Sequence, residues 1–248
     1  MTGQEKGSLG AVPPLRTDYR LAAALAAPVA RLALRQQNQR ALLPALLHEV
    51  NGSLNGLTLS TELLARVPPR PGAADAAAQP ADLLQRTRTE LSRLKTILRS
   101  MERHLAPAES ALGGLPRTPF DAVMQEVQAV LMPAVRRNQL AWQPAVAPTG
   151  AAVAVARGAE ETFDLLAGFA IIAIEAAPAG STLEPTTGCD GERVLFGIRH
   201  AGTARTGFGL ELHRELLRAA VAEGGSGVDW WQLEDGCVAR LALRRAVD

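Results

Sequence analysis

One histidine of this sequence has a setting that suits covalent chemistry. His48 lies in the string LLHEVNGSLNGLTLSTELL, and an acidic residue, Glu49, follows it directly. A neutral imidazole is nucleophilic near neutral pH and can accept a phosphoryl group from an acyl phosphate. A carboxylate beside the ring could hydrogen-bond it or accept its proton. We therefore assign His48 and Glu49 as the candidate catalytic pair, while the reading of His48 as an ordinary surface residue stays open.

The periodicity around His48 predicts how the ring is presented. Apolar positions recur at alternating steps of four and three, as expected for a heptad helix with one polar member. They are Leu43, Leu47, Val50, Leu54, Leu57, Thr61 and Leu64. His48 lies about 160° from the centre of this stripe at 100° per residue, so we expect an exposed ring.

Small residues beside His48 indicate that another protein approaches this face. Each of the two glycines, Gly52 and Gly56, costs a helix about 1 kcal/mol relative to alanine. A helix that carries both next to one histidine leaves room for close approach to the ring. The predicted partner-binding residues are Ala45, Asn51, Gly52 and Asn55.

The elements that must position His48 form a predicted helical hairpin. The first helix spans about residues 18–67 and should break or kink at Pro28 and Pro44. A proline-rich linker at 67–80 precedes a second heptad helix at about 81–105. Its apolar positions are Leu84, Leu91, Leu94, Leu98, Met101 and Leu105. Two narrow apolar seams cannot bury each other fully, so we predict a homodimer in which two hairpins form a four-helix bundle.

The second half of the chain changes its periodicity and predicts an α/β unit. The predicted division is a disordered N-terminus at 1–16, the hairpin at 17–106, a hinge at 107–119 and the α/β unit at 120–248. The expected elements of the last unit are helices at 120–138, 159–177 and 208–223 and strands at 140–144, 151–155, 192–199, 227–231 and 237–244. The fold class is therefore α+β.

The string His48-Glu49-Val50-Asn51-Gly52-Ser53-Leu54 resembles the phosphoacceptor box of two-component histidine kinases, His-Glu-x-Asn-Asn-Pro-Leu. The resemblance extends over roughly residues 30–245, because a heptad hairpin is followed by an α/β unit in the place of the ATP-binding domain. It implies an antiparallel hairpin in a dimeric four-helix bundle and an α/β sandwich like that domain. Ser53 replaces the family proline, and Gly52 replaces a polar residue that many members use in dephosphorylation.

The ATP-binding motifs of the family are degenerate here. Its two metal-holding asparagines correspond to Gly168 and Ile172, which offer no oxygen ligand to a hard cation. His200 stands where the adenine-binding aspartate belongs. The glycine-rich turn survives in TGFGLELHRELL, but only about three residues separate Gly202 from Thr206, too few for the usual lid. The resemblance thus implies a degenerate ATPase-like domain with no cofactor and no metal.

We therefore expect a histidine phosphotransferase in a phosphorelay, which exchanges a phosphoryl group between His48 and receiver-domain aspartates without ATP. The expected partners are receiver domains of response regulators, with a hybrid histidine kinase as a further candidate. Two alternatives remain open. One is a non-catalytic pseudokinase scaffold that binds a response regulator or a kinase, and the other is a working, divergent kinase.

The composition of the chain excludes several other classes of function. The chain has 26 basic and 25 acidic side chains, so no general field attracts nucleic acid or anionic membrane. Cys189 and Cys237 cannot form a disulfide framework or a metal knuckle and are expected as reduced thiols. The N-terminus lacks the apolar core of a signal peptide, and the longest apolar run, residues 165–174, is about half a bilayer span. We expect a soluble, cytoplasmic protein.

The remaining histidines and the tryptophans have ordinary expected roles. Surface positions are expected for His104, His200 and His213. The core or a domain interface is expected for Trp142, Trp230 and Trp231.

Overall fold

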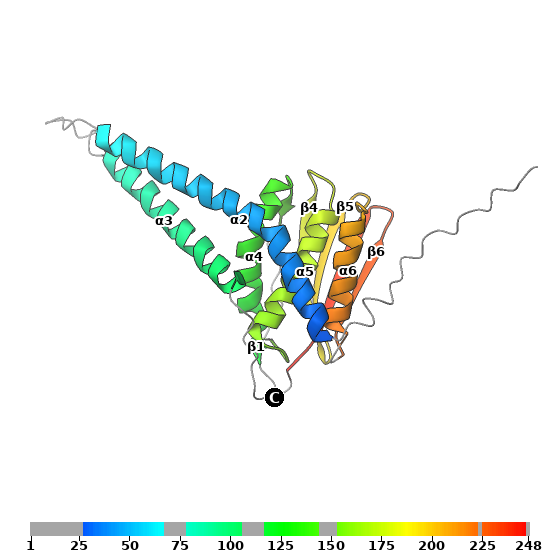
Figure 1. The fold of residues 1–248 in the computed structure, drawn as a ribbon. Coiled ribbons are helices and arrows are strands. Elements are labelled where there is room, and N and C mark those ends of the chain that lie inside the picture. Colours follow the sequence, from blue (N-terminus) through cyan, green and yellow to red (C-terminus); the bar gives the residue numbers. More distant parts are fainter. Residues whose placement is uncertain (1–26, 67–77, 106–116, 144–152, 223–224, 247–248) are drawn as a thin grey trace, which may run out of the picture.

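The structure of the chain is a computed structural model that describes residues 27–66, 78–105, 117–143, 153–222 and 225–246. Two long helices, α2 (Ala27–Arg66) and α3 (Ala78–Leu105), form an antiparallel pair whose outer end stands clear of the rest (Figure 1). The predicted disorder at 1–16, most of the 67–80 linker and most of the 107–119 hinge lie outside the described residues.

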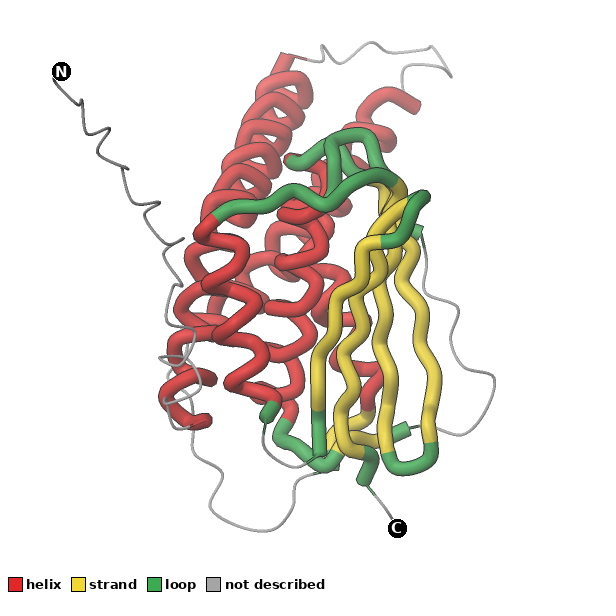
Figure 2. The backbone as a smooth tube through the Cα atoms, turned by 90° about the vertical axis from the view of Figure 1, so that its right-hand side faces the viewer, coloured by secondary structure: helices red, strands yellow, loops and turns green. Residues whose placement is uncertain are grey.

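The remaining elements form a layer of helices on a sheet. The helices are α4 (Phe120–Arg137), α5 (Ala159–Ala176) and α6 (Phe208–Val221). The strands are β1 (Thr118–Pro119), β2 (Ala141–Trp142), β3 (Ala154–Val155), β4 (Thr182–Asp190), β5 (Arg193–Ala201), β6 (Gly227–Gln232) and β7 (Gly236–Arg244). The sheet order is β2-β4-β5-β7-β6, and the helices cover one of its faces (Figure 2). The expected mixture of helices and sheet is confirmed, and the dimeric four-helix bundle stays a prediction.

Strand pairing follows the alternation of buried and exposed side chains. In β5, Val194, Phe196 and Ile198 point to the helices, and the residues between them are more exposed. β5 pairs antiparallel with β4 and β7, whereas β2 pairs parallel with β4. β1 and β3 form a separate antiparallel pair. Gly191, with a φ of 53°, begins the two-residue loop between β4 and β5, where a positive φ favours glycine.

The sequence-based prediction missed β4, the strand that pairs with β5 from Arg193 to His200. Pro185 and Gly188 resemble loop residues, and neither favours a strand interior. However, β2 pairs only with Thr182 and Leu183 at the start of β4. Beyond Leu183, the edge of β4 on the side of β2 has no described strand partner. Pro185 lies in this stretch, so the N–H group that it lacks costs no hydrogen bond between strands.

Pro44 does not break α2, which continues from Ala27 to Arg66, whereas a kink at Pro44 stays a prediction. Pro28 directly follows the first described residue, Ala27, so the predicted break or kink there stays a prediction. Pro44 lies inside the helix with an exposed side chain. Its neighbours Leu42, Ala45 and Leu46 are buried in the core. The burial of these neighbours offsets the cost of the hydrogen bond that Pro44 cannot make.

One hydrophobic core joins the first half of α2 to the sheet unit. Ala30, Leu34 and Leu42 of α2 belong to the same buried cluster as the side chains of α4, α5 and the sheet. Helix α5 is buried almost all round because it lies between the sheet and α2. Residues 27–46 therefore pack with the sheet unit, which consists of α4, α5, α6 and the strands. In sequence, however, they come before α3, the helix with which α2 forms the hairpin.

Candidate functional site

His48 lies where α2 leaves the sheet unit. The last core residue before it is Leu46, and beyond it α2 runs beside α3 (Figure 1). His48 is exposed, as are the predicted partner-binding residues Asn51, Gly52 and Asn55. These four residues share one helix face, because positions separated by three, four and seven residues lie above one another. A Cβ at Gly52 would meet nothing within 4 Å, so this face is open beside the ring.

Ala45 corrects one expectation for this face. It was predicted as a partner-binding residue, but only 3% of it is exposed. Ala45 belongs to the buried hydrophobic cluster that joins the first half of α2 to the rest of the chain. The accessible face beside His48 therefore extends from the ring toward Asn55 and excludes Ala45, although Pro44, four residues before the ring, is also exposed.

Glu49 points into the junction of three helices. Its side chain is 12% exposed and pairs with Arg93 of α3 and Arg136 of α4, the latter with Nη2 2.9 Å from Glu49 Oε1. Within the described residues Glu49 makes no hydrogen bond to His48, because its carboxylate pairs with the two arginines instead. Sequence analysis missed both arginines. They lie on other helices, far along the chain, and carry no local signal.

Solvent and ligands cannot reach the three positions at which the resemblance places nucleotide-binding residues. A Cβ at Gly168 of α5 would lie 2.9 Å from Leu34 Cδ1 and 3.0 Å from Asn38 Oδ1, both on α2. Ile172 is fully buried, and His200 is buried on β5. The first half of α2 thus covers the part of α5 at which the resemblance places metal-holding side chains.

Asn38 fastens α2 to both α5 and α6. Its Nδ2 donates to the backbone oxygen of Asp164 at 2.8 Å, and its Oδ1 lies 3.0 Å from His213 Nε2. Since an amide oxygen only accepts, Nε2 of His213 carries the proton. His213 is fully buried and His200 nearly so, which corrects the expectation that both lie on the surface. The side chain of His104 lies outside the described residues.

Burial shifts two pKa values at this junction in opposite senses. Desolvation lowers the pKa of His213 to about 4, because the charged imidazolium loses its hydration. Desolvation also raises the pKa of Asp164 to about 7, although Arg35 Nε lies 4.0 Å from its carboxylate and acts in the other direction. Both groups favour their neutral forms, as expected between packed helices.

The His213→Gln variant should remove a pH dependence of stability. Unfolded histidine titrates near 6.5, so the neutral His213 contributes fully above that pH and loses its contribution as the pH falls toward 4. Between pH 7.5 and 5 the wild type should lose about 2 kcal/mol relative to the variant. Chemical denaturation at both pH values measures this difference. Asp164 is present in both proteins and cancels, so a constant difference would contradict the assignment.

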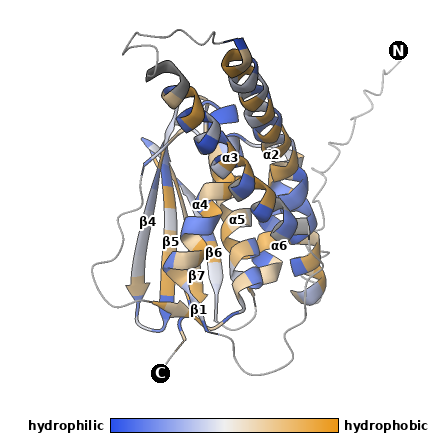
Figure 3. Cartoon of the chain, turned by 90° about the vertical axis from the view of Figure 1, so that its left-hand side faces the viewer, coloured by the Kyte–Doolittle hydropathy of each residue, from blue (hydrophilic) through white to orange (hydrophobic). Residues whose placement is uncertain are grey.

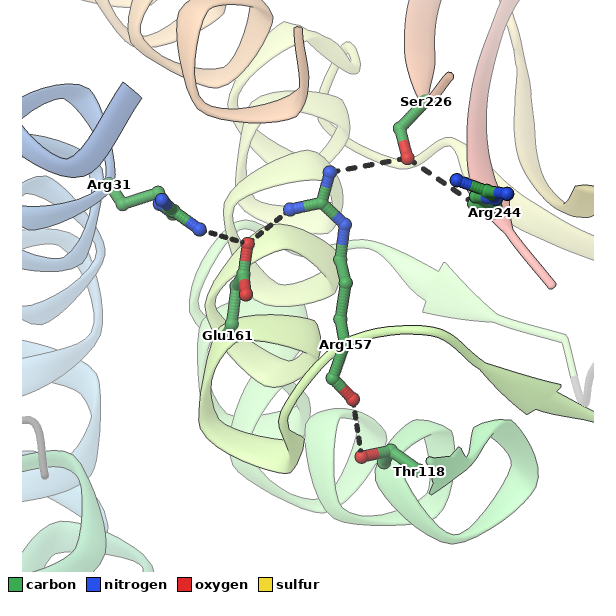
Figure 4. A network of polar contacts seen from close by, with 6 residues as sticks. All are labelled: Arg31, Thr118, Arg157, Glu161, Ser226 and Arg244. Atoms are coloured by element: carbon green, nitrogen blue, oxygen red, sulfur yellow. Dashed lines mark hydrogen bonds and ion pairs between the residues drawn. The ribbon is translucent and has the colours of Figure 1, made fainter. Parts of the chain in front are cut away.

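A second polar network holds the start of α2 (Figure 4). Arg31 of α2 pairs with Glu161 of α5 at 2.6 Å, and Arg157 pairs with the same carboxylate. Arg157 also donates to Ser226 Oγ at 3.3 Å, and its backbone oxygen accepts from Thr118 Oγ1 at 2.8 Å. These contacts join α2, α5 and the strand ends, so α2 is attached by charge as well as by apolar packing.

The tryptophan and cysteine expectations hold in part. Trp142 and Trp230 pack against the core, and Arg218 lies 5.0 Å above the Trp230 ring. Trp231 is exposed, which corrects its expected burial. Cys189 and Cys237 are free thiols.

The described part of the chain offers no obvious metal site or membrane span. It contains no group of three or more side chains of the kinds that ligate metals. None of the described helices combines the length and apolar character needed to cross a bilayer.

Comparison with known proteins finds distant structural likeness. The chain is similar to the catalytic domain of histidine kinase ThkA, with 14% identity and a TM-score of 0.45 over 54% of this chain and 98% of that one. It is similar to histidine kinase AdeS of Acinetobacter baumannii, with 13% identity and a TM-score of 0.41 over 82% and 96%. It is also similar to a bacterial phosphotransferase, with 14% identity and a TM-score of 0.44 over 82% and 95%. The sequence matches no protein-family model and no curated protein.

Proposed function

We propose that the chain is a two-component signalling protein of the histidine phosphotransferase type. In this role His48 accepts a phosphoryl group from the aspartyl phosphate of one receiver domain and passes it to the aspartate of another. One imidazole nitrogen forms the N–P bond as the P–O bond to the donor carboxylate breaks, and the electron pair of that bond stays on the carboxylate oxygen. The observation that carries the proposal is that His48 is exposed, whereas the positions at which a nucleotide would be expected on the sheet unit are covered by α2 or buried.

The open face of α2 supports His48 as the acceptor. The ring is exposed, and Asn51, Gly52 and Asn55 extend the same face without covering it. A receiver domain brings its aspartyl phosphate from a concave site, so the acceptor ring must stand clear of its own helix. An exposed ring with a glycine one turn away satisfies this requirement.

The packing of α2 on α5 supports transfer without ATP. Gly168 is in contact with Leu34 and Asn38, and Ile172 is fully buried, so neither position is open to a metal–nucleotide complex. The proposed donor is therefore a phosphorylated protein and not ATP bound to the same chain.

The direct test supplies each donor separately. The protein is incubated with radiolabelled ATP and Mg²⁺, and in parallel with a panel of receiver domains that carry labelled aspartyl phosphate. We expect an acid-labile, base-stable phosphohistidine only with phosphorylated receivers, mapped to His48 by mass spectrometry. Strong labelling by ATP alone would instead support a working kinase.

We also propose that two copies of α2 and α3 form a four-helix bundle. Leucines at heptad spacing on α3 are about half exposed in the single chain, with Leu84 at 49%, Leu91 at 51% and Leu98 at 49%. On α2, Leu47 and Leu54 are exposed to 46% and 45%. Figure 3 shows hydrophobic residues along the helical pair where it stands clear of the sheet. A second copy would cover these rows.

The Leu91→Glu variant should convert the proposed dimer to a monomer. Two glutamates near the two-fold axis of a bundle would bury charge without partners, and dimerisation should weaken by at least about 100-fold. Size-exclusion chromatography with light scattering measures the mass. Leu212→Glu is the matched control, because Leu212 is similarly exposed on α6. An unchanged mass for Leu91→Glu would contradict the proposed bundle.

The pseudokinase scaffold remains the second candidate. The close packing of α2 on α5 and α6 favours it, because the helix that carries His48 and the sheet unit then present one joined surface to a partner. A scaffold predicts that receiver binding survives His48→Ala unchanged and that no phosphohistidine forms. The phosphotransferase predicts similar binding with loss of transfer, so a transfer assay separates the two.

A further inference from the structure

Glu49 presents an electrostatic difficulty for phosphoryl transfer at His48. Phosphoryl donors are anions, and a free carboxylate next to the accepting ring would repel them. The repulsion between unit charges about 7 Å apart in water is comparable to thermal energy and is felt most at low ionic strength. A phosphoryl acceptor therefore benefits if this charge is cancelled.

The helices around Glu49 supply that cancellation. Arg93 of α3 and Arg136 of α4 both pair with Glu49 Oε1, the latter at 2.9 Å. A second acid, Glu90, lies with Oε1 4.0 Å from Arg93 Nη1. The four side chains therefore sum to zero charge. Arg136 comes from the sheet unit, so that unit takes part in the surroundings of His48 without holding a nucleotide.

We propose that Arg93 and Arg136 are positioning residues for phosphoryl transfer, which hold Glu49 away from the His48 ring and neutralise its charge. Glu49 then acts as the anchor of this ion pair and not as a proton acceptor for the imidazole. The inference rests on the proposed function and deepens it, because it assigns the sheet unit a part in the reaction.

Phosphoramidate provides a test that needs no identified partner. One imidazole nitrogen forms the N–P bond with its lone pair while the P–N bond of the reagent breaks. Ammonia leaves with that electron pair, and the other ring nitrogen keeps its proton. The reagent is a monoanion near neutral pH, so its second-order rate constant with His48 reports the local charge directly.

The expected changes have opposite signs for the two members of the ion pair. At about 10 mM ionic strength, Arg136→Gln should lower the rate about twofold and Glu49→Gln should raise it about twofold. The double variant Glu49→Gln/Arg136→Gln should return close to the wild-type rate, and Arg136→Lys should retain it. At about 1 M salt all these rates should converge, because the Debye length falls to about 3 Å.

Controls separate this inference from the proposed function and from simple misfolding. Arg240→Gln, which removes an exposed arginine paired with Asp229 on the sheet, should leave the rate unchanged. A fall in rate for Glu49→Gln at every salt concentration would overturn the inference in favour of a proton-accepting Glu49. Rates insensitive to Arg136 and to salt would also overturn it. No phosphohistidine in the wild type would overturn the proposed function itself, and this inference with it.

Discussion

The His48→Ala variant should lose all phosphoryl transfer while the fold and receiver binding remain. Alanine has no nucleophilic nitrogen, and of the other histidines whose side chains the structure describes, His200 and His213, both are buried. We expect transfer from a phosphorylated receiver to fall at least about 1000-fold, to the background of spontaneous hydrolysis. The loss of labelled phosphohistidine on a gel, followed over time, measures this change.

Stability measurements serve as the control for His48→Ala. An exposed histidine away from the core should change the free energy of unfolding by less than about 0.5 kcal/mol when replaced by alanine. Pull-down of the receiver should likewise be retained, because Asn51, Gly52 and Asn55 of the proposed contact face are unchanged. Equal transfer by the variant and the wild type would contradict the assignment of His48. Loss of both binding and stability would contradict its placement on an open face.

The sequence predicted those features that depend on local geometry. The angle between His48 and the heptad stripe is set by residues within two turns, and the exposed ring follows from it. The same holds for the helices, whose periodicity is local and whose observed bounds lie within a few residues of the predicted ones in the α/β unit. Asn51, Gly52 and Asn55 were found accessible for the same reason.

Features that depend on contacts between distant segments were missed. Glu49 was placed with its sequence neighbour His48, whereas its partners Arg93 and Arg136 approach from α3 and α4. His213 sits in a helix pattern that reads as surface, and it is buried only because α2 lies across α6. In each case the deciding partner comes from another helix, and local periodicity holds no information about it.

Gly168 combines a local feature that the sequence predicted with a contact between distant segments that it did not predict. The resemblance to histidine kinases implies that a metal-holding asparagine is absent there, which follows from a local comparison of strings. It did not indicate that Leu34 and Asn38 of α2 occupy the space above it. The glycine is therefore explained better by close helix packing than by simple loss of a ligand.

The Gly168→Asn variant should be destabilised and should gain no nucleotide binding. Its Cβ would lie 2.9 Å from Leu34 Cδ1 and 3.0 Å from Asn38 Oδ1, and Asn38 is held by hydrogen bonds to Asp164 and His213. Forcing the helices apart and burying a second amide should cost about 3 kcal/mol. Chemical denaturation measures the loss, and titration with a fluorescent ATP analogue measures binding.

The same substitution at an open glycine provides the matched control. A Cβ at Gly52 meets nothing within 4 Å, so Gly52→Asn should change stability by less than about 0.5 kcal/mol, since asparagine and glycine differ little in helix propensity. The contrast between the two variants isolates the packing of α2 on α5 from any general effect of asparagine in a helix. A stable Gly168→Asn protein that binds the ATP analogue would show that α2 leaves this surface readily. The sheet unit would then retain a nucleotide site, and transfer without ATP would lose its structural support.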